Sequence, residues 1–178
     1  MGEDDEVEMD IAYSVLVVYL VLVAVWDLKT GRIPNLLTLP AMAGVAAYRV
    51  ASAARLAYYG LPPWEEMRFV GFWAGVFVLW MLGVGGGDAK VLMVLFGIFP
   101  TMEFMATLLL VTGGVMVVVL SVRYARQGRL GMFFKNMAFR AVRWSFLPTR
   151  AEAVEGGEPT AFLFSLAAMV WLVLQQIR

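Results

Sequence analysis

Six long apolar runs, separated by short polar turns, constrain the fold of this chain more than any other feature. Of its 178 residues, 61% are hydrophobic and 16% are charged, whereas a soluble domain is about half apolar and a quarter charged. A helix needs about 20 apolar residues to cross ~30 Å of hydrocarbon. We therefore expect an all-α, polytopic integral membrane protein with about six transmembrane helices, near 11–26, 36–50, 69–83, 91–99, 104–122 and 160–177.

The uneven distribution of charge predicts an orientation. The first ten residues include six acidic and no basic side chains, whereas 123–150 includes seven basic and no acidic ones. Lysine and arginine gather on the cytoplasmic side of membrane proteins, so we expect the N-terminus outside and Lys29, Arg32 and Lys90 inside. This charge pattern orients a chain in the bilayer of the cell membrane and does not indicate a nucleic-acid partner.

We expect one membrane-embedded domain over 1–178, with 123–158 as a cytoplasmic loop. Apolar side chains recur at helical spacing within this loop and alternate with basic ones, which predicts a basic amphipathic helix on the inner surface. At the other end of the second helix, Arg49 is expected to extend its guanidinium toward the outer headgroups.

The chain contains no cysteine and no histidine. This excludes disulfides, thiolate nucleophiles, cysteine-rich zinc sites, Ser-His-Asp triads and the H-E-x-x-H metalloproteases. We expect neither a metal ion nor a cofactor. If the protein is a hydrolase, carboxylates are the obvious acid and base groups that remain.

Two aspartates, Asp27 and Asp88, each lie where an apolar run meets a short polar turn. The predicted orientation places both on the cytoplasmic face, and ionisable groups at membrane depth are costly and usually functional. Each also has an ordinary structural interpretation: Asp27 follows a helix end, and Asp88 could cap the fourth helix after a glycine elbow. Asn35 would likewise be the N-cap of the second helix.

A carboxylate pair can hydrolyse a peptide bond. One carboxylate takes a proton from water, and the other, protonated, polarises the scissile carbonyl. Two adjacent carboxyls lose their protons in separate steps, because two close anions cannot both form cheaply. Lys90 and Arg32 are candidates for tuning such a pair or for contacting the substrate backbone, although anchoring on the inner face also explains them.

Two short elements around these aspartates resemble those of a known family. Asp27 is followed by Arg32-Ile33-Pro34-Asn35, and Gly85-Gly86-Gly87-Asp88-Ala89-Lys90 comes about sixty residues later. In this order, within a six-helix chain, they resemble the D-x(5)-I-P-N and G-x-G-D-x-K elements of the prepilin and preflagellin peptidases, which are membrane aspartic proteases.

The resemblance implies that Asp27 and Asp88 are the catalytic pair and that Gly85 and Gly87 allow close backbone packing, with Pro34 and Asn35 completing the first element. It also implies an aspartic endopeptidase of the short, peptidase-only type that removes a basic leader from pilin-like or archaellin-like precursors at the cytoplasmic face. The longer bacterial members carry a cysteine-bearing insertion and methylate the new N-terminus. This chain has no such domain.

Other functions stay open on the sequence alone. A small ion- or proton-coupled transporter could use the same aspartates, although such a carrier would place carboxylates near the bilayer midplane. A non-catalytic subunit of a secretion or pilus machine would need neither aspartate. Presenilin-like proteases share G-x-G-D but pair it with Tyr-Asp and Pro-Ala-Leu elements, and this chain has Trp26-Asp27 and no Pro-Ala-Leu.

Overall fold

The computed structural model describes residues 3–82, 85–126, 128, 131, 135 and 161–177. All regular elements in these ranges are helices, which confirms the predicted all-α membrane architecture. They are α1 (Glu3–Thr30), α2 (Asn35–Tyr58), α3 (Trp64–Met81), α4 (Gly86–Ile98), α5 (Met102–Arg126) and α8 (Ala161–Ile177). The amphipathic helix predicted within 123–158 falls largely outside the described residues.

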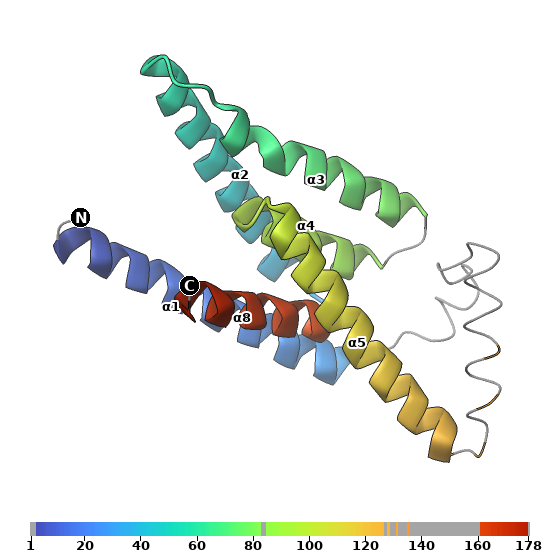
Figure 1. Cartoon of the computed structure of the whole chain (residues 1–178). Coiled ribbons are helices and arrows are strands. Elements are labelled where there is room, and N and C mark those ends of the chain that lie inside the picture. Colours follow the sequence, from blue (N-terminus) through green and yellow to red (C-terminus); the bar gives the residue numbers. More distant parts are fainter. Residues whose placement is uncertain are drawn as a thin grey trace.

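Residues that cannot continue a helix separate these elements. Gly31 adopts a positive φ of 60° directly after α1, a backbone conformation that costs glycine little, and its amide donates to the Asp27 carbonyl at 2.7 Å. Pro34 then takes the N-cap position of α2 in an extended conformation. Gly60, with φ of 72°, turns the chain between α2 and α3. These local breaks produce short connections, so neighbouring helices run in alternating directions (Figure 1).

The helices form two groups that meet in the middle of the molecule (Figure 1). In the first group, α2 and α3 lie on α4; in the second, α1 and α5 lie on α8, and α4 also contacts α8. The shared core is aromatic: Phe104 of α5 packs against Phe96 of α4 and against Trp171 of α8, with ring centroids 5.6 Å and 5.8 Å apart.

By length and composition, three helices can cross a membrane: the described parts of α1 from Tyr13, of α2 and of α5. By contrast, α4 has 13 residues, which gives a length of about 20 Å, shorter than the ~30 Å hydrocarbon core. Its side chains from Val91 to Phe96 are buried or half-buried by neighbouring helices. This short helix is therefore held mainly by protein.

Candidate active site

Asp27 lies in the last turn of α1, where its side chain is 3% exposed. A carboxylate near a helix C-terminus faces the unfavourable end of that helix's dipole. The neighbouring α8 compensates for this, because α8 begins beside Asp27 and its first amides point toward the carboxylate. The Phe162 amide donates to Oδ2 of Asp27 at 3.1 Å, and the backbone of Ala161 also contacts this carboxyl group.

Asp88 lies in the first turn of α4, where the dipole of its own helix favours an anion. Its carboxylate folds back over Gly85, the N-cap residue. A Cβ atom at Gly85 would lie 3.1 Å from Oδ2 of Asp88, so a larger residue there would press on the carboxylate. Both aspartates are thus placed at a helix N-terminus: Asp88 at that of α4, and Asp27 at that of α8.

The two sequence elements are in direct contact. A Cβ atom built at Gly87 would lie 3.5 Å from Cβ of Ile33, which is ordinary van der Waals contact. One turn further along α4, Nζ of Lys90 donates to Oδ1 of Asn35 at 2.5 Å. The structure therefore brings the Ile33-Pro34-Asn35 element and the glycine-aspartate element together. We call this end of the bundle, formed by the end of α1 and the starts of α2, α4 and α8, the aspartate end.

The remaining residues of these elements differ in what they contact. The expectation that Asn35 caps α2 is wrong: Pro34 is the N-cap, and the Asn35 side chain accepts from Lys90 instead. The Arg32 side chain is exposed, while its backbone amide donates to Oγ1 of Thr30 at 3.2 Å. Pro34 supplies the fixed φ that starts α2 beside α4.

Three contacts between the helices that carry or surround the site were not predicted. The α8 amide at Asp27 joins residues 135 positions apart in the chain. Gly97 allows a close approach of α2 to α4, because a Cβ atom there would overlap Cγ1 of Val45. Trp73 of α3 donates its indole N–H to the Met93 carbonyl of α4 at 2.6 Å. Of these, only Gly97 carried a local signal, as a glycine inside an apolar helix.

Arg49 also differs from its expected role. Its guanidinium is engaged by neighbouring helices, donating to the carbonyls of Gly97 and Ile98 and pairing with Glu66. The desolvated ends of α4 and α3 offer it three acceptors, which explains these contacts. Within the described residues, no group of three or more aspartates and glutamates could hold a metal ion.

Comparison with known proteins agrees with this geometry. The family model described as the type IV leader peptidase family matches residues 14–122, which is more than half of the chain and includes both aspartates with their elements. The searches of curated proteins and of solved structures found no match. From the matched span, and from the two elements that meet within it, the chain belongs to the type IV leader peptidase family.

Proposed function

We propose that the protein is a membrane aspartic endopeptidase that removes the short basic leader from pilin-like or archaellin-like precursors at the cytoplasmic face. Membership of the family makes it a leader peptidase in general terms. The more specific proposal depends chiefly on one observation, the contact of the two elements at the aspartate end through Ile33 and Gly87 and through Asn35 and Lys90.

In the proposed reaction, Asp27 and Asp88 act on the scissile amide together. One carboxylate accepts a proton from water as the water oxygen attacks the carbonyl carbon, and the other, protonated, donates to the carbonyl oxygen. The resulting gem-diol collapses when its C–N bond breaks: the first carboxyl gives the proton taken from water to the leaving amine, and the second regains its proton from a hydroxyl of the gem-diol. The chain's own residues supply both groups, and the α8 amide keeps the Asp27 carboxylate oriented.

The shape of the substrate suits this site. The precursor enters the membrane as an apolar helix preceded by a basic leader, and its cleavage site lies at the membrane boundary. Lys29, Arg32 and Lys90 are close in sequence to the two aspartates, and a basic side chain, Lys90, lies where the two elements meet. A leader peptide that approaches from the polar side therefore reaches the two carboxylates without crossing the bilayer.

The central test is leader removal by aspartate variants. Asp27→Asn and Asp88→Asn keep the side-chain shape and remove the acid and base function, so each should abolish cleavage of a tagged precursor in proteoliposomes. Glu65→Gln is the matched control, because Glu65 is an exposed carboxylate on α3, outside both elements, and should cleave normally. Cleavage by either aspartate variant at the wild-type rate contradicts the proposal.

A second experiment tests the proposed orientation. The chain has no cysteine, so single cysteines can be introduced without background. Lys29→Cys at the aspartate end should be protected from a membrane-impermeant maleimide in intact cells, whereas Leu61→Cys in the turn between α2 and α3 should react. The reverse pattern would place the active site on the outer face.

A further inference from the structure

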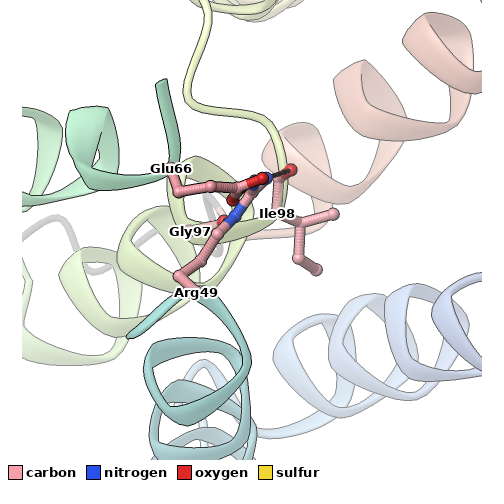
Figure 2. A network of polar contacts seen from close by, with 4 residues as sticks. All are labelled: Arg49, Glu66, Gly97 and Ile98. Atoms are coloured by element: carbon pink, nitrogen blue, oxygen red, sulfur yellow. Dashed lines mark hydrogen bonds and ion pairs between the residues drawn. The ribbon is translucent and has the colours of Figure 1, made fainter. Parts of the chain in front are cut away.

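Arg49 connects α2, α3 and α4 (Figure 2), at the end of α4 opposite to Asp88. From α2, its Nε donates to the Gly97 carbonyl at 2.8 Å, and one terminal nitrogen donates to the Ile98 carbonyl at 2.6 Å. Its other terminal nitrogen pairs with Glu66 of α3 at 2.5 Å, and the two side chains are 17% and 21% exposed. A half-buried arginine in an apolar helix is costly in free energy, and residues of this kind usually have a function.

The role of Arg49 follows from the length of α4. A helix leaves its last four carbonyls without partners in the helix, and a helix of 13 residues ends before it reaches the far headgroups. The Leu95 carbonyl accepts from the Phe99 amide at 2.8 Å, and Arg49 serves the carbonyls of Gly97 and Ile98. The guanidinium thus replaces the water that would otherwise satisfy this helix end.

The same helix, α2, also contacts the other end of α4. There, Asn35 accepts from Lys90, two residues after Asp88. At the Arg49 end, Val45 packs against Gly97 so closely that no side chain fits there. Because α4 is too short for the bilayer to fix its depth, these contacts with α2 fix it. Among the α2 side chains that make these contacts, Arg49 is the charged one, and its planar fork engages two successive carbonyls at once.

We propose that Arg49 is a positioning residue that sets the depth of α4 along α2, and through α4 the level of Asp88 at the aspartate end. The expected effect of Arg49 on cleavage rests on the proposed function, whereas its expected effect on the position of α4 does not. A small displacement of a catalytic group can lower the rate by about a hundredfold. Loss of Arg49 should therefore lower kcat more than it changes KM.

A disulfide reports the position of α4 directly. A Cβ atom at position 87 would lie 3.5 Å from Cβ of Ile33, within the range of about 3.5–4.5 Å that disulfides require. In the cysteine-free chain, Ile33→Cys with Gly87→Cys should therefore cross-link quickly under mild oxidation. Adding Arg49→Met should slow this cross-linking about tenfold, because a shift of a few ångströms takes the sulfurs out of range.

Arg49→Lys keeps the charge but not the planar fork, so it should insert normally and show intermediate cross-linking and cleavage. The matched control is Arg68→Met, which removes an arginine from the exposed pair with Glu65. It should match the protein with the native arginines in both assays: the double-cysteine protein in cross-linking and the cysteine-free protein in cleavage. Cleavage is measured in the chain without cysteines, with kcat and KM determined separately and the folded fraction checked by gel filtration.

Three results would overturn the proposal. Arg49→Lys and Arg49→Met could both cross-link and cleave like the parent. Arg49→Met could lose cleavage while cross-linking stays fast, which would show that Arg49 does not act through the position of α4. Arg49→Met could also raise KM alone. A failure of the proposed function is separate: it would appear as normal cleavage by Asp88→Asn, with the cross-linking result unaffected.

Discussion

The two aspartates are carried by helices that are held in opposite ways. Asp27 lies on α1, which has 28 residues and a length of about 42 Å, enough for the bilayer to position it. Asp88 lies on α4, which has 13 residues. Apart from the Phe162 amide at Asp27, α1 and α8 contribute buried aliphatic and small side chains such as Leu20 and Ala168 to the apolar core, and the two helices pack together. Along α4, polar side chains of α2 and α3 reach its backbone or its lysine at three levels.

This difference shows where a membrane protein needs polar contacts between helices. A long apolar helix gains its depth from the hydrocarbon thickness, so apolar packing is sufficient to keep it beside its neighbour. A short, enclosed helix has no such reference. The group of α2, α3 and α4 supplies one with a lysine, a tryptophan and an arginine, and in our proposal the level of Asp88 depends on these contacts. Variants in each group test this difference separately.

The largest effect is expected at Gly97, where α4 packs tightly against Val45 of α2. Gly97→Ala introduces a Cβ atom that overlaps Cγ1 of Val45, so it should cost about 3 kcal/mol, the upper range for overpacking. The thermal midpoint in detergent measures this loss. Adding Val45→Ala removes the overlapping atom and should restore most of the stability. Gly75→Ala, where no atom lies within 4 Å of the new Cβ, should have little effect, and an equal loss there would contradict the argument.

The next effect tests the other group at Asp27. Phe162→Pro removes the amide that donates to Oδ2 of Asp27, and proline is tolerated in the first turn of a helix. Leaving a buried carboxylate oxygen without this donor should cost about 2 kcal/mol and slow cleavage.

Two controls isolate the amide. Phe162→Ala removes the ring but keeps the N–H, so cleavage should stay close to wild type. Glu65→Pro places proline at the corresponding position of α3, away from both aspartates, and should also cleave normally. If Phe162→Ala is as slow as Phe162→Pro, the aromatic ring and not the amide supports Asp27.

A smaller effect is expected for the contact between Lys90 and Asn35. Each single variant, Lys90→Met or Asn35→Leu, should lower stability by about 1 kcal/mol, because it leaves one polar group without its partner. The double variant should cost less than the sum of the two, which a double-mutant cycle of thermal midpoints measures. Additive losses would show that the two side chains do not interact in the membrane.

The smallest effect concerns the exposed pair of Arg68 and Glu65 on α3, whose side chains are 55% and 69% exposed. Surface pairs of this kind contribute about 0–1 kcal/mol, so Arg68→Gln should leave both the thermal midpoint and cleavage unchanged. A loss of cleavage as large as that of Arg49→Met would remove the distinction between the two arginines.

The sequence predicted the parts of this structure that depend on residue type and local spacing. The apolar runs gave six helices close to their observed positions, and the two elements around Asp27 and Asp88 were expected at the same end of the bundle, where they meet. These predictions succeed because apolar length and glycine or proline breaks act locally.

The contacts that hold the two aspartates were not predictable in this way. The partner of Asp27 is a main-chain amide 135 residues away, and an amide is present at almost every position of any chain. Arg49 was expected at the headgroups because its distance from the helix end suits that role, and its engagement by neighbouring helices depends on where α4 stops. Both contacts arise from tertiary packing, which local patterns do not encode.

The enclosure of α4 has a consequence for how the lipid environment affects this protein. A thicker or thinner bilayer changes the tilt of long, exposed helices. The helices α1, α2 and α5 expose large apolar side chains, so their tilt should respond to such a change. The helix that carries Asp88 touches neighbouring protein along most of its surface and follows α2 instead. We therefore expect membranes of different thickness to act on Asp27 directly through α1 but on Asp88 only through α2, so that lipid composition changes the alignment of the two residues.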